Sequence, residues 1–297
     1  MSKSGTETPG GTSIRSVFQS ALNRHGYPFQ YAVIRRAKEL KKEGLSEWDF
    51  EASEFPVEVQ GYNTKIDFIL SRCPGGGSYG YLVAECKRTN PSFSEWLFAK
   101  APYVRRDRSS DTLNVECARF ADQHILASVG TLPLIGDIYH IPLPVKTNNA
   151  QGDDSGGREA IENAATQVIR GMNGLIQYIV KNNFIIQGSL SPAFFVPVIF
   201  TTARLWATDA DISEADLETG NVDFADAKVE RKPWLWMQYH MSPTLKHFAD
   251  REDSSADSFF KGTLGYLLKR EFSRTIAIVS TDGIDSFLRR SSSDWWG

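Results

Sequence analysis

The sequence predicts a mixed α/β protein, and three observations support this fold class. Apolar residues recur at helical spacing from about residue 29 to residue 43, and three short apolar segments separated by turns follow. A second, longer helical pattern occupies residues 159–180, and further apolar segments come after it. Because helical and strand patterns alternate along one chain, we expect a mixed central sheet flanked by helices.

The first predicted helix runs from Phe29 to Glu43. Val33, Ala37 and Leu40 fall on one stripe of this helix, which is the spacing of a face that packs on a core. Gly44 follows the helix and is well suited to end it, because glycine readily adopts the left-handed conformation of a C-terminal cap.

Three predicted strands follow the helix. Phe55–Val59 alternates between apolar and polar residues, whereas Ile66–Leu70 and Tyr81–Arg88 are more continuously apolar. Residues 61–64 and the glycine-rich segment 73–78 supply the turns between them. Because such short connections join antiparallel strands, we expect an antiparallel meander.

The rest of the chain is expected to complete the sheet. Its predicted elements are a helix or loop beginning in Pro91–Ala99, a long helix over 159–180, strands over 194–206 and 234–240, and a last strand over 274–280 followed by a short helix. An acidic segment separates the strands at 194–206 and 234–240. The long helix is expected to pack on the sheet.

We expect one domain that spans residues 14–290. Residues 1–13 are rich in Ser, Thr, Gly and Pro and predict a flexible tail, and residues 291–297 predict a short C-terminal tail. Polar stretches at about 146–158 and 207–232 predict loop insertions within the domain.

Composition narrows the class of protein. The 297 residues are 41% hydrophobic, which is enough for a substantial core, and the net charge of −3 gives no bulk attraction for nucleic-acid phosphates. The three cysteines lack metal-site spacing, and no signal peptide or membrane-spanning run is evident. We therefore expect a cytoplasmic protein without a membrane partner. Any contact with nucleic acid would have to come from a local patch or through metal ions.

Three charged residues occupy the second and third predicted strands. Asp67 lies within the second strand, and Glu85 and Lys87 share one face of the third, because alternate residues of a strand point to the same side. Buried carboxylates are costly unless they are paired or bind a metal, and one lysine compensates only in part for two acids. A divalent cation is the missing partner that this pattern predicts.

The arrangement of Asp67 in one strand and Glu85-x-Lys87 in the next resembles the core motif of the PD-(D/E)xK nuclease superfamily. The motif is short and degenerate, and Ile66 stands where a proline is often found. The resemblance extends from about Phe29 to the segment around Leu288, although only the two strands carry diagnostic residues. It implies a restriction-endonuclease-like fold and a metal-dependent endonuclease that hydrolyses phosphodiester bonds, in host defence or DNA processing.

The resemblance also implies a role for each residue. Asp67 and Glu85 would hold Mg²⁺ or Mn²⁺ together with the backbone carbonyl of Cys86, while the Cys86 thiol faces the core. Lys87 would lie beside the attacking water, where it orients the water and neutralises developing charge. Hard cations of this kind prefer oxygen ligands, which carboxylates and a carbonyl supply.

Relatives often add a further acid or glutamine to these residues. Gln30 and Glu39 in the first helix and Glu54 and Glu58 near the first strand are the candidates, and the sequence does not choose among them. The Gln-x-x-x-Tyr motif of recombination-type relatives is absent after Gln167.

The expected substrate is nucleic acid, with DNA favoured over RNA because most of the superfamily acts on DNA. A second candidate region for nucleic-acid contact is a cluster of basic residues around Tyr103, made of Lys100, Arg105, Arg106 and Arg108, although a solvated loop is the simpler interpretation. A homodimer or a partner protein could supply target choice. The main alternative is a catalytically silent module of the same fold that binds nucleic acid or a protein.

The glycine-rich turn also matches two unrelated motifs. Gly76-x-Ser78-x-Gly80 has the pattern of a serine-hydrolase nucleophile elbow, and Gly75-x-Gly77-x-x-Gly80 that of a dinucleotide-binding loop. Both motifs require a helix directly after the turn, whereas a strand is predicted here. We therefore interpret this segment as a connection between strands.

Overall fold

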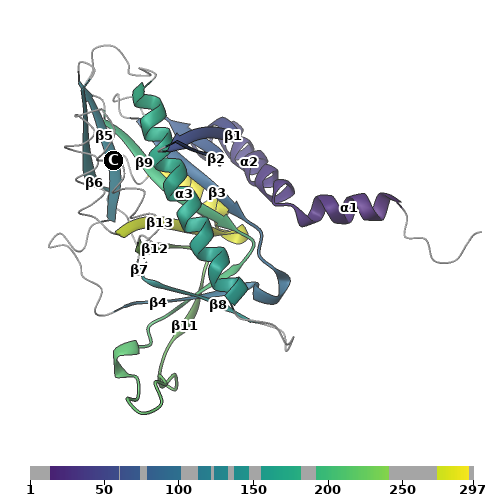
Figure 1. Ribbon diagram of the computed structural model, residues 1–297, viewed down its shortest axis with the longest axis vertical. Helices are drawn as coiled ribbons and strands as arrows, with labels where there is room; N and C mark the ends of the chain where they lie inside the picture. The colour runs from purple at the N-terminus through teal and green to yellow at the C-terminus, as the bar shows by residue number, and fades with distance from the viewer. Residues whose placement is uncertain are drawn as a thin grey trace, which may run out of the picture.

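The computed structural model describes residues 14–59, 61–73, 79–101, 113–121, 124–132, 137–146, 155–181, 192–240 and 273–293 (Figure 1). It has the predicted mixed α/β architecture, with a central mixed sheet flanked by helices. The predicted N-terminal tail, most of the glycine-rich turn and the basic residues Arg105, Arg106 and Arg108 lie outside these ranges.

The central sheet has its strands in the order β1-β2-β3-β9-β13-β12-β7. Their bounds are Asp49–Val59 (β1), Tyr62–Arg72 (β2), Tyr79–Lys87 (β3), Pro192–Thr201 (β9), Ser273–Ser280 (β13), Trp234–His240 (β12) and Ile138–Tyr139 (β7). Strands β1, β2 and β3 form the predicted antiparallel meander, and β3 then runs parallel to β9. A hairpin of β5 (Leu113–Ala121) and β6 (His124–Leu132) is added through antiparallel pairing of β5 with β9.

A smaller sheet lies beside the central one. Its strand order is β11-β10-β4-β8, with bounds Val229–Lys232 (β11), Arg204–Thr208 (β10), Glu95–Ala99 (β4) and Ile141–Val145 (β8). In Figure 1 these strands lie below the central sheet, and the loop between β10 and β11 forms the lowest part of the molecule.

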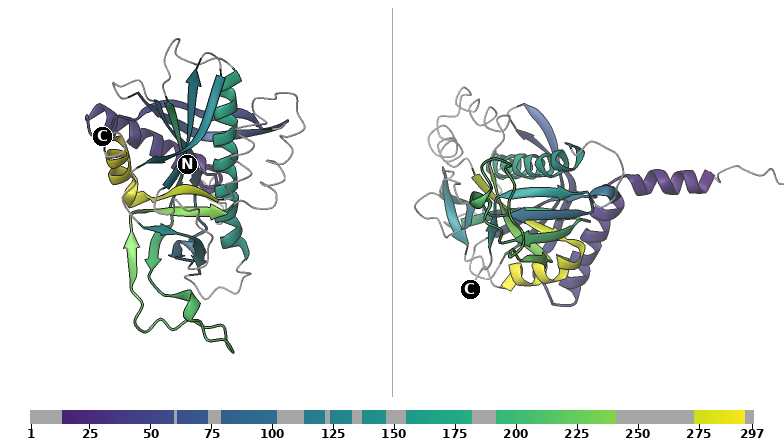
Figure 2. Two further views of the ribbon diagram at one scale, coloured as in Figure 1. Left: turned by 90° about the vertical axis from the view of Figure 1, so that its left-hand side faces the viewer. Right: turned by 90° about the horizontal axis from the view of Figure 1, so that it is seen from below.

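Helices cover both faces of the central sheet, and each face has its own core. The helices are α1 (Ile14–Arg24), α2 (Tyr27–Lys42), α3 (Ser155–Lys181) and α7 (Ile284–Ser293), with short 3-10 turns at Pro91–Phe93, Ile212–Glu214 and Thr281–Gly283. Apolar residues of α3 pack with one set of strand side chains, and those of α2 and α7 pack with the opposite set. Figure 2 shows α1 extending away from this layered body.

The long helix α3 packs closely on the meander because it carries two glycines at the contact. A Cβ atom at Gly174 would lie 2.6 Å from Cγ2 of Val57 on β1. A Cβ atom at Gly171 would lie 2.9 Å from Cγ1 of Ile66 on β2. The glycines therefore allow the helix to approach the strand that carries Asp67, and this contact holds β1 and β2 in place from one side.

The expectation of a helix or loop beginning in Pro91–Ala99 was wrong for most of that segment. After the 3-10 turn at Pro91–Phe93, residues Glu95–Ala99 form β4, which pairs with β10 on one side and β8 on the other. Trp96 and Phe98 are both buried, two residues apart. An apolar run this short has no periodicity that separates a strand from a helix, so its pairing partners decided.

The single strand expected over 194–206 is two strands in different sheets. The chain leaves β9 at Thr201 and enters β10 at Arg204. At the break, the hydroxyl oxygen of Thr201 accepts a hydrogen bond from the backbone N–H of Ala203 at 3.1 Å, which is a turn that threonine favours.

Several expected boundaries also need correction. The first strand begins at Asp49 rather than at Phe55, and the turn expected over 61–64 is shorter because β2 already begins at Tyr62. The insertion at 207–232 is shorter, because Thr208 pairs with Val229 at the end of a β10–β11 ladder. The insertion at 146–158 ends earlier, since α3 begins at Ser155. The C-terminal tail begins later than residue 291, because α7 continues to Ser293 and buries Ser291.

Within the described part of the chain, no helix has a stretch that is both long and apolar enough to span a membrane.

The close approach of α3 to the meander predicts that a larger residue at Gly174 destabilises the fold. Gly174→Ala is expected to lower the free energy of unfolding by about 1–3 kcal/mol, because the added methyl group overlaps Val57. Urea unfolding of the full chain measures this. Gly26→Ala is a suitable control, since a Cβ there meets nothing within 4 Å. The loss should shrink in the Val57→Gly background, because this change removes both Cγ2 and the Cβ that would lie 2.7 Å from the added methyl group. An equal loss in both backgrounds would contradict the proposed contact.

Candidate active site

Three acidic residues form a row across the antiparallel meander. The pairing of β2 with β3 ends at Phe68 and Ala84, so Asp67 and Glu85 stand opposite each other one residue beyond. The pairing of β1 with β2 includes Ser53 with Phe68 and Phe55 with Ile66, so that Glu54 stands opposite Asp67. The register of three strands therefore brings together carboxylates that are far apart in sequence.

Hydrogen bonds fix Asp67 from two directions. Its Oδ2 accepts a bond of 2.6 Å from the backbone N–H of Cys86, which ties the carboxylate to β3. Its backbone carbonyl accepts a bond of 2.6 Å from Nε2 of Gln30, and the same Nε2 donates to Oε1 of Glu54 at 2.9 Å. Gln30 is itself buried on α2, so the helix holds two strands of the site through one side chain.

Burial makes both central carboxylates weak acids in the metal-free protein. Burial, supported by the charge of the Asp67 carboxylate, raises the pKa of Glu85 from 4.5 to about 8, although Lys87 acts in the opposite direction. Burial likewise raises the pKa of Asp67 from 3.8 to about 6, against the hydrogen bond from Cys86. Ionisation of the two acids is therefore unfavourable in the metal-free protein, and a bound cation would favour it.

Glu54 has an unusual backbone conformation. Its φ is +51°, in the left-handed region that residues other than glycine seldom adopt, and it is the non-glycine residue with this feature among the described residues. Its carboxylate lies 3.7 Å from Nζ of Lys65 and accepts the bond from Gln30. Strain of this kind persists where surrounding contacts impose it, and it is common at functional sites.

Lys87 and Cys86 occupy opposite sides of the end of β3. Lys87 is half-buried, two residues beyond Glu85 on the same side of the strand, and its backbone carbonyl accepts a bond of 3.2 Å from the N–H of Thr202. The Cys86 side chain is buried in the core formed with α2 and α7, and burial raises the pKa of its thiol. The thiol therefore packs in the core and the amide serves the site.

Other residues considered from the sequence lie elsewhere or outside the described ranges. Glu39 pairs with Arg36 on the exposed side of α2, with 3.2 Å between the charged atoms. Glu58 is exposed at the other end of β1, opposite Asn63. Lys100 pairs with Asp137 at 2.9 Å, and Ser78 is not among the described residues. Of the four candidates for a further site residue, Gln30 and Glu54 are therefore the two that meet Asp67.

The oxygen donors of the site suit a hard divalent cation. The Glu85 side chain, with the residue only 7% exposed, has no hydrogen-bond or ion-pair partner among the described residues. Across those same residues, no set of three or more His, Cys, Asp and Glu side chains is arranged to hold a metal. Any cation here would therefore rest on two carboxylates, those of Asp67 and Glu85, together with main-chain or solvent oxygens.

The pKa shifts predict how stability changes with pH in EDTA. An acid whose pKa is raised by folding binds its proton more tightly in the folded state, so the free energy of unfolding falls as pH rises from about 4.5 to about 8. Glu85→Gln removes the part of this pH dependence that comes from Glu85. The difference in the free energy of unfolding between the variant and the wild type is expected to shift in favour of the variant by about 1–3 kcal/mol as the pH rises from about 5 to about 8. Urea unfolding at these two pH values measures the difference.

Glu39→Gln is the matched control, because Glu39 is an exposed glutamate on the surface of α2. The free energy of unfolding of Glu39→Gln should differ little from that of the wild type at about pH 5 and at about pH 8. A Glu85→Gln difference that does not change with pH would contradict the assignment of Glu85 as a buried acid.

The chain was also compared with known proteins. No profile of a protein family, no curated protein and no solved structure gives a significant match. The function of the protein must therefore be inferred from the geometry of the acidic row itself.

Proposed function

We propose that the protein is a metal-dependent nuclease that hydrolyses phosphodiester bonds, with DNA favoured as substrate over RNA. The observation that carries this proposal is the placement of Asp67 and Glu85 side by side on adjacent strands, with Lys87 two residues beyond Glu85. Two buried acids without sufficient cationic compensation favour a site built for a metal over an ordinary structural ion pair.

Asp67, Glu85 and the backbone carbonyl of Cys86 would hold Mg²⁺ or Mn²⁺. Such an ion, when bound, polarises a phosphate oxygen and makes a coordinated water more acidic. The two carboxylates must be ionised to serve as ligands, and their raised pKa values mean that protons compete with the metal below about pH 8. Activity is therefore expected to rise with pH across this range.

Lys87 supplies the positive charge at the reacting phosphate. Its ammonium group has three donors and can orient the attacking water while it stabilises negative charge that grows in the transition state. The carbonyl bond to Thr202 fixes its backbone relative to β9, since Lys87 also pairs with Thr201. The strand end thus presents the lysine from a rigid base.

Gln30 and Glu54 act as positioning residues in this proposal. Gln30 holds the main chain at Asp67 and the Glu54 side chain, so it fixes the spacing of the first two acids in the row. The Glu54 charge further raises the pKa values of Asp67 and Glu85, which increases the demand for a cation.

A cleavage assay tests the activity directly. Plasmid, linear and single-stranded DNA and RNA are incubated with the protein in Mg²⁺, Mn²⁺ or EDTA. Asp67→Asn and Lys87→Ala are each expected to lower the cleavage rate by at least about 100-fold, because each removes a group that acts in the transition state. EDTA should abolish cleavage.

Glu39→Gln and Lys41→Ala are the controls for loss of a carboxylate and of an ammonium group, since both residues are exposed and form surface ion pairs. Both variants should cleave at close to the wild-type rate. Equal cleavage by the wild type, Asp67→Asn and Lys87→Ala would overturn the proposed function.

Metal binding can be measured without any substrate. Mn²⁺ is expected to raise the melting temperature of the wild type in proportion to the logarithm of its concentration, because it binds the folded state. The increase should be lost in Asp67→Asn and in Glu85→Gln and kept in Glu39→Gln. An unchanged increase in both site variants would show that the cation binds elsewhere.

A further inference from the structure

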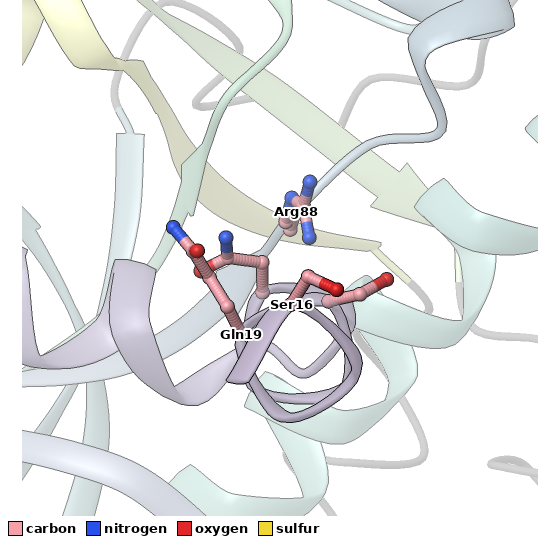
Figure 3. A pocket seen from close by; sticks show the side chains of 5 residues that line it. Ser16, Gln19 and Arg88 are labelled. Atoms are coloured by element: carbon pink, nitrogen blue, oxygen red, sulfur yellow. The ribbon is translucent and has the colours of Figure 1, made fainter. Parts of the chain in front are cut away.

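A solvent-open pocket of about 360 Å³ lies between α1 and the end of β3 (Figure 3). Its lining residues are Ser16, Gln19, Ser20, Asn23 and Arg88. The four α1 residues follow the spacing i, i+3, i+4 and i+7, so they form one face of the helix. Every lining side chain can donate a hydrogen bond, and none is acidic.

Arg88 is the charged member of this pocket. It is exposed, and no hydrogen bond or ion pair links it to any described residue. The sequence of α1 contains no Asp or Glu, so the helix offers no carboxylate to neutralise it. An unpaired guanidinium beside neutral donors is a recognition site for an anion, because the planar guanidinium matches the oxygens of a phosphate.

The pocket directly adjoins the proposed active site along the chain. Arg88 follows Lys87, and the two side chains leave the strand on opposite sides. The backbone here is anchored on both sides, since the carbonyl of Lys87 accepts a bond from Thr202 and the N–H of Thr89 donates to Oγ1 of Thr202 at 2.9 Å. The strand end therefore carries one positively charged side chain on each side, Lys87 on the side of Glu85 and Arg88 in the pocket.

Burial of apolar surface does not explain the orientation of α1. Its apolar residues Ile14, Val17, Phe18 and Leu22 are 47–64% exposed and lie on the side of the helix opposite the pocket face. The face turned toward Arg88 is the hydrogen-bonding one. The helix therefore presents donors to the pocket without any gain from packing its apolar stripe there.

We propose that this pocket binds a backbone phosphate of the nucleic-acid substrate, next to the phosphate that is cleaved. The inference rests on the proposed nuclease function and extends it by naming where the strand is held. Contacts of this kind position a strand without reading its bases, so the pocket is expected to contribute affinity with little sequence preference. A locally basic pocket also explains how a chain with net charge −3 can engage a polyanion.

Binding can be measured separately from cleavage by fluorescence anisotropy, with the full chain carrying Asp67→Asn in EDTA. The probes are a labelled DNA duplex, the matching single strand and the matching RNA strand, which distinguish the possible sources of the phosphate. Adding Arg88→Gln is expected to weaken binding about tenfold at low salt and to reduce the salt dependence by about one counterion. Gln19→Glu should weaken binding as well, whereas Gln19→Lys should strengthen it.

Arg231→Gln is the matched control, because it removes the same charge from β11, which lies away from α1 in Figure 1. Opposite effects of Glu and Lys at position 19 cannot come from loss of folding. The proposal is overturned if Arg88→Gln and Arg231→Gln change the binding affinity equally. It is also overturned if no probe binds the Asp67→Asn protein that keeps Arg88. If Asp67→Asn loses cleavage while Arg88→Gln binds normally, the proposed phosphate pocket is wrong and the proposed nuclease function stands. If binding depends on Arg88 while Asp67→Asn still cleaves, the pocket stands and the proposed active site is wrong.

Discussion

The hydrogen bond from the Cys86 amide to the Asp67 carboxylate is the interaction on which the candidate site depends. At 2.6 Å it joins β2 and β3 one step beyond their regular pairing, where both strands carry an acid. A shift of the register by one residue would turn one acid to the opposite face of the sheet. The chemistry proposed for this protein therefore requires the pairing of the meander to be fixed, and the two cores on either side of the sheet fix it.

The packing of those two cores also offsets the destabilisation that the site residues cause. Desolvated acids and a left-handed glutamate each destabilise the fold, and such costs are tolerated at functional sites when the surrounding structure is rigid. The α3 helix, brought close by Gly171 and Gly174, supports the meander from one face, and α2 supports it from the other. Gln30 links the two functions of α2, because the helix that packs the core also holds the main chain at Asp67.

Positive charge at the site is concentrated at one strand end. Lys87 lies on the side of Glu85, and Arg88 lies in the pocket beneath α1, with both held by the turn that contains Thr202. Meanwhile the segment between β10 and β11, rich in Asp and Glu, is distant from α1 in Figure 1. In the proposed function, this separation of charge would let a nearly neutral chain engage a polyanion at one local surface.

Sequence alone determined the elements whose periodicity is long or whose turns are short. The helix containing Val33, the long helix α3 and the antiparallel meander follow from local patterns, and so does the placement of Asp67, Glu85 and Lys87 on neighbouring strands. The tertiary structure decided which short apolar runs became strands, as for β4, and which of four candidates joined the site. Gln30 and Glu54 meet Asp67 only because α2 and β1 pack beside β2, and contacts between residues so far apart leave no local signal in a single sequence.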